Sequence, residues 1–559
     1  MPARIFVCII LSRFWTKPSA VIAIAILIFA FSLAFTSKRL LRYLRFLQQE
    51  EYQTGRFFSW IRSHGAIDRK GSGMALFAIL FAAWSSLGLG SMAAIAAALG
   101  ILLIAVLEED PREAGKIPLR MTERAKRIYV LAVAAAGALL FLLLCYALFR
   151  GSELSLSWYW FFHLLYYQSV PVWLALAVRL LQPGEDRRQA VFLQEATDKI
   201  AEMHPYVIGI TGSFGKTSTK AILGKILEVT LAPTFCPPKS INTLMGITRE
   251  IREQLKEGQK YAVIEMGAYA RGSIARLCAL TPPQAAIVTA VGYMHLERFG
   301  SHENILLAKS ELAQAVPMSG VLICNADDEG AREIAKRHPK ARTFLYSIES
   351  QTSETACRIS NVETRIEGTS FTIHWNGKEY PAFTPLHGRP SLSNILAAFT
   401  MACALGAQPP LVVAAIGSLE PVDNRLQVKR FDGYTQINDA YNSNPLGFAA
   451  ALDVLAALPG KRKILVTPGM IELGGEQAVE NERVAKLAAR VCDLVLVVGE
   501  INRAALASGL LQGGLKAVSI IYCSGRKEAL EQLGRIRGED DVVLLENDLP
   551  DLYEFDLSF

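Results

Sequence analysis

A glycine-rich segment near the middle of the chain carries residues suited to phosphate chemistry. It reads Gly209-Ile-Thr-Gly212-Ser-Phe-Gly215-Lys-Thr-Ser-Thr219. Glycines let backbone N–H groups turn toward phosphate oxygens, and a following helix adds the positive end of its dipole. A lysine in this place reaches the β and γ phosphates of a nucleotide, and the next threonine hydroxyl can bind Mg²⁺. The segment therefore predicts a nucleotide site formed by Gly212, Ser213, Gly215, Lys216, Thr217 and Ser218.

The flanks of this segment are those that a phosphate loop requires. A strand-like run, Tyr206–Ile210, leads into it, and a helix-like run that ends at Val229 follows it. A plain glycine-rich turn, the alternative interpretation, needs neither element. The spacing departs from the usual Walker pattern, because Ile210 stands where that pattern has a glycine.

Beyond this loop, short β-rich apolar runs alternate with amphipathic stretches. The predicted strands cover residues 206–210, 261–265, 285–289, 320–324, 463–467, 494–498, 519–522 and 542–545. Such alternation is typical of parallel sheets with helices on both faces, so we predict an α/β fold. Cys357–Tyr380 alternates with period two and predicts an antiparallel hairpin. A break at Leu386–Pro390 predicts the boundary between a central domain, 183–389, and a C-terminal domain, 390–559.

Long apolar runs without a charged residue occupy the first third of the chain. They cover residues 18–37, 73–107, 128–149 and 154–178. Because about 20 apolar residues suffice to cross a bilayer, each run predicts at least one span. The second run contains Gly88, Gly90 and Ser91 near its middle, which predicts two spans joined by a turn. We therefore predict an α-helical transmembrane domain of about five spans over residues 1–182, with a polar linker at Gln182–Gln189.

The distribution of charge predicts the orientation of these spans. Basic residues gather in one loop, at Lys38, Arg39, Arg42, Arg45, Arg56, Arg62, Arg69 and Lys70. The positive-inside rule makes this loop cytoplasmic, and the chain after Arg179 with it. Interleaved aromatic residues, such as Phe57 and Trp60, also suit contact with anionic headgroups or a phosphate-bearing lipid; a plain positive-inside loop is the alternative. A net charge of +6 over 559 residues does not indicate nucleic-acid binding, and we expect none.

Further polar motifs follow the phosphate loop along the chain. They are Ala262-Val-Ile-Glu265, His295-Leu-Glu-Arg-Phe299, Ala308-Lys309-Ser-Glu311, Asn325-Ala-Asp327, Asn424-Arg425-Leu and Asp439-Ala-Tyr441-Asn442-Ser-Asn444. In this order they resemble the motifs of the Mur ligases, the ATP-dependent amide-bond ligases of peptidoglycan precursor synthesis. The resemblance covers roughly residues 200–550. It implies a P-loop central ATPase domain, a Rossmann-like C-terminal domain, and ATP and Mg²⁺ as cofactors.

The resemblance also implies a role for each matching residue. The implied metal ligands are Thr217, Glu265, His295 and Lys309. Lys309 stands where several family members carry a carbamylated lysine, and Arg425 resembles the arginine that closes onto ATP. The implied catalytic residues are accordingly Lys216, His295, Lys309 and Arg425. The implied nucleotide-binding residues outside the loop are Asn325, Asp327, Arg425, Asp439, Tyr441, Asn442 and Asn444.

Two departures from the family bear on the substrates. The usual N-terminal domain that binds a uridine nucleotide is not recognisable, and the predicted spans occupy its place, which favours a lipid-linked acceptor. The segment from Asp439 is similar to that of the branch that adds D-alanyl-D-alanine. In the segment Thr467–Gly474, however, Gly469 replaces the aspartate usual in that branch. The amine is therefore D-alanyl-D-alanine or another amino acid or peptide.

These observations favour a multi-pass ligase of the bacterial inner membrane with cytoplasmic catalytic domains. The resemblance implies that it forms an amide through an acyl phosphate, joining a cell-wall precursor carboxylate to an amine, and we expect membrane lipid as a further partner. One alternative keeps the chemistry but uses a non-murein polymer or a lipid-linked precursor. Another is an ATP-driven transporter or sensor, although the predicted spans carry almost no charge and no transport signature is recognisable. A degenerate scaffold is the last alternative, and the retained Lys216 and Glu265 argue against it.

Overall fold

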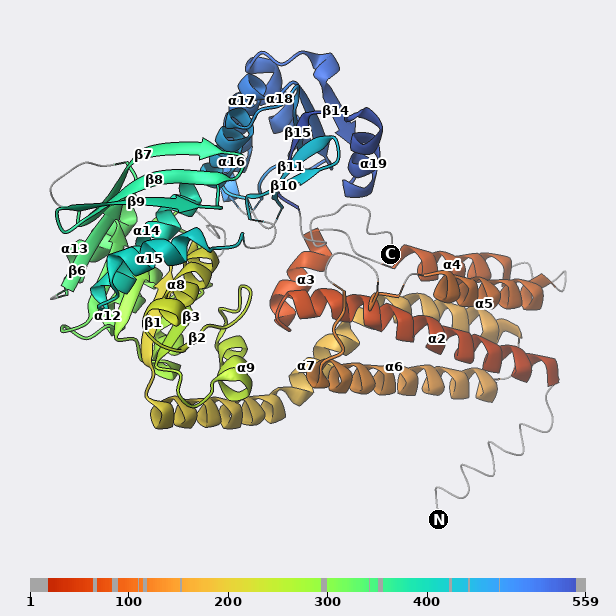
Figure 1. Cartoon of the computed structure of the whole chain (residues 1–559). Coiled ribbons are helices and arrows are strands. Elements are labelled where there is room, and N and C mark those ends of the chain that lie inside the picture. Colours follow the sequence, from red (N-terminus) through yellow and green to blue (C-terminus); the bar gives the residue numbers. More distant parts are fainter. Residues whose placement is uncertain are drawn as a thin grey trace. The chain divides into compact units, whose positions relative to one another are not determined.

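The structure, a computed structural model, falls into two units that are described separately (Figure 1). One ends at Arg188, and the other covers Gln189–Leu549. The described residues are 19–63, 68–82, 89–108, 110–113, 118–150, 153–292, 299–340, 342–349, 355–421, 425–440, 443–471 and 473–548.

The first unit is helical. Its helices are α2 (Ser19–Gln49), α3 (Thr54–Ser63), α4 (Arg69–Ala82), α5 (Leu89–Leu107), α6 (Glu123–Arg150) and the first part of α7 (Glu153–Met203), whose last residues belong to the second unit. Helix α2 packs against α5 and α6, and α4 packs against α5 (Figure 1). The predicted break of the apolar run 73–107 into two helices is confirmed, because α4 ends before α5 begins.

Three helices in the described part of this unit are long and apolar enough to cross a bilayer. The qualifying segments are Ile22–Gln49, Glu123–Tyr146 and Trp158–Met203. This count differs from the five spans predicted. Helix α4 has 14 residues and rises only about 21 Å at 1.5 Å per residue, which is short of a hydrocarbon core of about 30 Å.

The predicted linker at Gln182–Gln189 is wrong, because α7 continues through it to Met203 without interruption. Pro183 lies inside the helix. Arg127 of α6 pairs with Glu185 of α7 at 2.7 Å, and Arg188 pairs with the same carboxylate at 3.2 Å. The helix therefore continues through this segment of Pro, Gly and charged residues, and the ion pairs of Glu185 stabilise it there.

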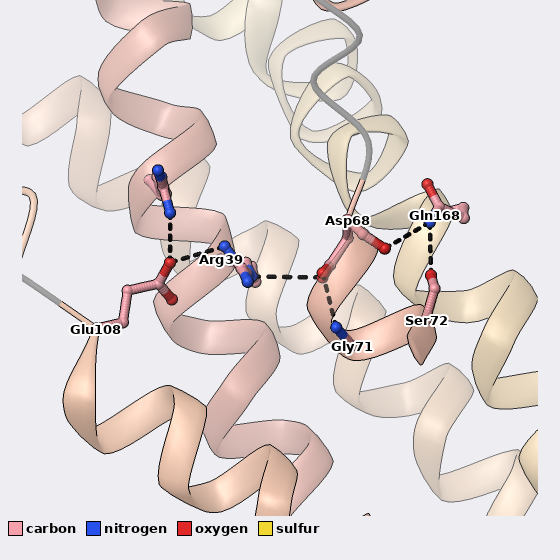
Figure 2. A network of polar contacts seen from close by, with 7 residues as sticks. Arg39, Asp68, Gly71, Ser72, Glu108 and Gln168 are labelled. Carbon is pink, nitrogen blue, oxygen red and sulfur yellow. Dashed lines mark hydrogen bonds and ion pairs between the residues drawn. The ribbon is translucent and has the colours of Figure 1, made fainter. Parts of the chain in front are cut away.

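Charged side chains from several helices meet inside the first unit (Figure 2). The Arg39 guanidinium donates to Glu108 at 2.7 Å and lies 3.3 Å from the Asp68 carboxylate. Asp68 precedes α4 and accepts from the backbone of Gly71 at 2.9 Å. Gln168 of α7 donates to the Asp68 carbonyl at 2.8 Å. Arg39, one of the residues predicted to face headgroups or solvent, is thus fully buried in an ion-pair network.

The second unit contains two sheets. The first has the order β2-β3-β1-β4-β5-β6-β7-β8-β9, and the second has the order β10-β11-β15-β12-β13-β14. The first sheet's strands are β1 (Tyr206–Thr211), β2 (Thr234–Phe235), β3 (Tyr261–Glu265), β4 (Ala285–Val288), β5 (Val321–Asn325), β6 (Arg342–Ser347), β7 (Cys357–Arg365), β8 (Gly368–Trp375) and β9 (Lys378–Thr384). The second sheet's strands are β10 (Gln427–Phe431), β11 (Tyr434–Asp439), β12 (Lys463–Thr467), β13 (Leu494–Val498), β14 (Ile520–Cys523) and β15 (Asp541–Glu546).

Helices cover both faces of the first sheet. They are α8 (Lys216–Thr230), α9 (Leu244–Gln254), α10 (Ser273–Leu280), α12 (His302–Ala315), α13 (Glu329–Arg337), α14 (Arg389–Ala404) and α15 (Pro409–Gly417). Alternate residues of β1 face opposite cores, as the period of two requires. Ile208 packs with α8 and α14, whereas Val207 packs on the other face, where Ile200 at the end of α7 also lies.

The second sheet is packed by α16 (Pro445–Ala457), α17 (Gln477–Val491), α18 (Arg503–Gln512) and α19 (Arg526–Ile536). All its strand pairs are parallel except β10 with β11. The predicted α/β fold is therefore confirmed for both parts of this unit. The segment predicted as a hairpin, Cys357–Tyr380, belongs to an antiparallel meander of three strands, β7, β8 and β9.

The predicted domain break at Leu386–Pro390 falls just before α14. This helix and α15 contribute Ile395, Phe399 and Ile416 to the core of the first sheet. A boundary at residue 389 would separate these helices from the core that they complete. The first strand of the second sheet begins only at Gln427.

Candidate active site

The predicted phosphate loop connects the end of β1 to the start of α8. Gly215 has φ of 81° and directly precedes α8, so this position needs the left-handed conformation that glycine adopts readily. A Cβ at Gly215 would also lie 2.5 Å from Asn394 Oδ1. No side chain caps the N-terminus of α8. The positive end of the helix dipole and its first amides therefore face this loop, as an anion site requires.

The loop lies where the connections of the sheet change direction. Strand β1 pairs with β3 on one side and β4 on the other, all in parallel. Ligands of open α/β sheets bind outside the carboxyl ends of the strands at such a point. Glu265 ends β3, Thr289 follows β4, and Asn325 ends β5. The predicted strands thus bring these three polar residues to the edge that carries the loop.

Glu265 joins the loop to two residues that the sequence did not single out. Its Oε2 accepts a hydrogen bond from the Thr217 hydroxyl at 2.8 Å, and its Oε1 accepts from the Asn242 amide at 2.9 Å. The Lys220 ammonium lies 3.5 Å from Oε2. Glu265 is 1% exposed. Lys220 lies one helical turn after Lys216, a spacing that could have indicated its place beside the loop.

The donor set around Thr217 fits Mg²⁺ chemically. A carboxylate and a hydroxyl are hard oxygen ligands, and protein sites for Mg²⁺ commonly use only one or two carboxylates together with substrate phosphates. No group of three or more His, Cys, Asp or Glu suited to a metal occurs among the described residues. His295, an implied ligand, lies outside them.

Lys309 of α12 is buried close to the phosphate loop. Burial lowers its pKa well below the usual value, and the nearby Lys216 ammonium lowers it further, against the opposing charge of Asp328. The side chain is therefore held toward its neutral form. A neutral amine is the form that carbamylation requires, so the environment suits the modification that the resemblance implies.

Lys216 itself bends over its own loop. Its ammonium donates to the Gly212 carbonyl at 2.7 Å and to the Ser213 carbonyl at 3.2 Å. Burial lowers the pKa of Lys216, Glu265 raises it, and Arg425 lowers it. The three charges that the sequence assigned to phosphate chemistry thus lie within electrostatic reach of one another.

Arg425 extends from the segment before β10 to the phosphate loop. Its Nη2 donates to the Thr217 hydroxyl at 3.4 Å. The next residue, Leu426, has φ of 48°, and its N–H donates to Asp439 Oδ1 at 3.0 Å. Asp439 therefore fixes the turn from which Arg425 projects.

The remaining predicted nucleotide residues make contacts within the protein. Asn325 donates to the Thr289 carbonyl at 3.1 Å, and Asp327 accepts from the Ile348 N–H at 2.7 Å. Asn444 caps α16, its side chain accepting from Gly447 N–H at 3.0 Å. Tyr441 and Asn442, like His295, lie outside the described residues.

A cavity of about 240 Å³ adjoins α8. Its lining includes Ser218, His387, Ser391, Asn394, Glu420 and Arg425. Asn394 is 7% exposed and accepts from the Thr219 hydroxyl at 3.1 Å. The sequence analysis did not single out Asn394. A buried amide in the otherwise apolar run Leu392-Ser-Asn-Ile-Leu-Ala was the available signal, because buried polar groups need a partner.

Comparisons with known proteins agree with this geometry. Residues 210–402 match the Mur ligase middle domain, and residues 424–546 match the Mur ligase glutamate ligase domain. The UDP-N-acetylmuramoyl-tripeptide--D-alanyl-D-alanine ligase of Mycobacterium leprae is 33% identical over 365 residues, covering 61% of this chain and 70% of the relative. The chain belongs to the Mur ligase family.

Other members of the family show how far the likeness extends. The Mycobacterium tuberculosis enzyme of the same name is 36% identical over 299 residues, 52% of this chain. The chain spans only 58% of the length of that relative. The MurF ligase from Thermotoga maritima, solved in complex with ADP, superposes with a TM-score of 0.57 at 26% identity, covering 64% of this chain and 80% of the other. The predicted family and its two α/β domains are therefore confirmed.

Proposed function

We propose that this Mur ligase family member is an ATP- and Mg²⁺-dependent ligase that forms an amide bond. The observation that carries the proposal is the meeting of Thr217, Glu265 and Arg425 at one point. A hydroxyl and a carboxylate suited to Mg²⁺ lie there with a cation from the second sheet, at the N-terminus of an uncapped helix. Transfer of a phosphoryl group requires positive charge and oriented donors in this arrangement.

In this proposal ATP binds with its phosphates on the loop. The cavity beside Ser218, Asn394 and His387 adjoins the same helix and would accommodate part of the nucleoside. In support, the Thermotoga maritima MurF ligase was solved with ADP. The segment before β10 contributes Arg425, and Asp439 of the C-terminal sheet, which we propose to be Rossmann-like, holds the backbone next to it. Tyr441 and Asn442 remain proposed nucleotide contacts.

Mg²⁺ would be held by Thr217 and Glu265, with His295 and a carbamylated Lys309 as proposed further ligands. When bound, the ion neutralises charge on the phosphate oxygens. Lys216 and Arg425 supply the protein's own positive charge to the same oxygens. Lys220, 3.5 Å from Glu265, offsets the charge of that carboxylate.

The reaction balances in two steps. A carboxylate oxygen of the acceptor bonds to the γ phosphorus, the bond to the bridging oxygen breaks, and ADP leaves with that electron pair. A neutral amine nitrogen then bonds to the acyl carbon, the carbon–oxygen bond to phosphate breaks, and the nitrogen loses a proton. The products are the amide, ADP and phosphate.

The proposed substrates follow the relatives, whose names specify UDP-N-acetylmuramoyl-tripeptide and D-alanyl-D-alanine. For this chain the acceptor is a cell-wall precursor carboxylate, and the amine is D-alanyl-D-alanine or a similar amino acid or peptide. Gly469 has φ of 76°, and a Cβ there would lie 2.4 Å from Asn481 Oδ1. An aspartate, usual at this place in the branch, would need a strained backbone and a shift of Asn481, so this segment differs from that of the branch.

We further propose that the first unit is a multi-pass domain of the bacterial plasma membrane, with the catalytic domains in the cytoplasm. Three long apolar helices support this placement. Such a domain favours an acceptor at the membrane, so a lipid-linked or non-murein precursor is the second candidate substrate for the same chemistry. An ATP-driven transporter or sensor remains the third and is separated by the test below.

Phosphate release by the full chain in detergent tests the proposal. The protein is given ATP and Mg²⁺ with a soluble uridine-nucleotide muramyl peptide or its lipid-linked counterpart, each with and without D-alanyl-D-alanine. We expect release to require both an acceptor and the amine, with the amide product detected by mass spectrometry. Release that is indifferent to acceptor and amine would overturn the ligase proposal in favour of a transporter or sensor.

A further inference from the structure

Two carboxyl groups lie side by side at the carboxyl edge of the second sheet. Asp439 ends β11 and Glu546 ends β15, and the two residues are direct partners in the parallel register of these strands. Neighbouring strands lie about 4.8 Å apart, and partners in register point to the same face. Asp439 is partly exposed, so a ligand can approach the pair from its side.

Glu546 is 1% exposed, and only one of its two carboxylate oxygens has a hydrogen-bond partner among the described residues. Its Oε1 accepts from the Ser443 hydroxyl at 2.6 Å, whereas its Oε2 has no hydrogen-bond partner among the described residues. A buried carboxylate oxygen without a partner is costly, and its retention needs a reason other than stability.

The electrostatics of the two carboxyl groups favour a positively charged ligand. Burial and the charge of Asp439 raise the pKa of Glu546 well above its usual value. Burial likewise raises the pKa of Asp439 to about 6, although its Leu426 hydrogen bond and the Arg425 charge oppose this. Two like charges so close resist ionising together, and a cation beside them would relieve that repulsion.

The pair also lies next to the reacting groups. Asp439 holds the backbone of Leu426, and the preceding residue, Arg425, reaches Thr217 of the phosphate loop. On the other side, Asn547 donates to the Gly469 carbonyl at 2.6 Å. The segment after β12, which departs from the D-alanyl-D-alanine branch at Gly469, therefore borders the same place.

We propose that Glu546, with Asp439 beside it, binds the ammonium group of the amine substrate. This inference rests on the proposed ligase function and names a residue that determines its specificity. An ammonium group bound against the partly exposed Asp439 carboxylate would direct its three N–H donors toward the buried, unpaired Glu546 oxygen behind it. The subsite selects for positive charge and against a substrate carboxylate in the same position.

Binding to the full chain in detergent tests the subsite without requiring turnover. Titration calorimetry in the presence of ADP and Mg²⁺ compares D-alanyl-D-alanine, L-alanine and L-lysine with their fully N-acetylated forms, which lack the cation. The variants are Glu546→Gln, whose side-chain carbonyl can still accept from Ser443, and Glu500→Gln as a matched control. Glu500 follows β13 at the same edge of the sheet, and its side chain is 60% exposed.

We expect the wild-type protein to bind at least one amine about tenfold or more tightly than its acetylated form, a difference of about 1.4 kcal/mol. Glu546→Gln should abolish this preference, and Glu500→Gln should keep it. Equal weakening of both forms in Glu546→Gln, an unchanged preference in that variant, or no preference in the wild type would each overturn the inference.

Kinetics separate this inference from the proposed function. If the wild type forms an amide, Glu546→Gln should raise KM for the amine about tenfold while KM for ATP stays unchanged. An active ligase with an unaltered amine KM in Glu546→Gln would overturn the subsite and leave the ligase proposal intact. If the wild type prefers the amine over its acetylated form, Glu546→Gln loses that preference, and the wild type forms no amide, the subsite stands and the ligase proposal fails.

Discussion

Lys216 is the residue whose charge the proposed reaction needs most directly. The loop carbonyls of Gly212 and Ser213 already hold its ammonium at the N-terminus of α8. Lys216→Ala should lower acceptor-dependent phosphate release about a hundredfold or more, because a preorganised donor to the transferring group is typically worth that much. Lys256→Ala, at an exposed loop position, is the control and should keep the wild-type rate. Full activity in Lys216→Ala would remove the phosphate-loop assignment.

Lys309 gives a second prediction at the scale of a single residue. Its lowered pKa favours the neutral amine, the form that can react with carbon dioxide to give an anionic carbamate. We expect Lys309→Ala to lose turnover and to recover part of it when short carboxylic acids such as acetate are added. The exposed Lys336 provides the control, since Lys336→Ala should need no rescue. Absence of any recovery in Lys309→Ala would count against the carbamate.

At the scale of an element, Asn444 has a structural role at the start of helix α16. The sequence assigns Asn444 to the nucleotide, whereas its side chain caps α16 through Gly447. Asn444→Ala should therefore lower the free energy of unfolding by about 1 kcal/mol, as measured by denaturant unfolding, and Asn444→Asp should retain the cap. We expect KM for ATP to stay unchanged in Asn444→Asp. A raised KM for ATP in that well-folded variant would instead support a direct contact with the nucleotide.

The ion-pair network in the first unit joins its helices. Arg39 of α2 is fully buried between Asp68 before α4 and Glu108 after α5 (Figure 2). Arg39→Ala would leave the buried Asp68 carboxylate without its cation, whereas Glu108 keeps Arg42 at 2.6 Å. Removal of one partner from a buried ion pair typically costs about 3–5 kcal/mol. We expect a marked fall in the melting temperature of the detergent-solubilised protein. Arg62→Ala, on the exposed face of α3, should leave the melting temperature unchanged, and equal behaviour of the two variants would contradict a structural role for the network.

At the scale of the whole molecule, short sequence patterns correctly predicted the strands and the phosphate loop, because these depend on neighbouring residues. The apolar run Tyr261–Glu265 and the glycines before Lys216 placed a strand end and a loop, and the structure brings them together at Thr217. Residues that reach the site by packing alone were missed. Asn242 and Asn394 lie far from the loop in sequence and meet it only through the sheet and α14.

Long-range partners also explain the errors. Glu185 looks like part of a polar linker until its partner Arg127, on another helix, is known. Arg39 looks like a headgroup contact until Asp68 and Glu108 are seen beside it. The β10–β11 hairpin was not predicted, because its strands are polar and are defined mainly by pairing with each other and with β15.

Removal of the first unit tests what that unit does for the whole protein. The cut belongs between Arg188 and Gln189, because Ala196 and Ile200, later in α7, pack in the core of the first sheet. We expect residues 189–559 to bind ATP and to release phosphate with a soluble acceptor, because the phosphate loop and its partners all lie in the second unit. Turnover of a lipid-linked acceptor should fall sharply, since the proposed membrane domain no longer brings the enzyme to it. Unchanged use of the lipid-linked acceptor would reduce the helices to an anchor, and loss of ATP binding would show that the second unit depends on the first to fold.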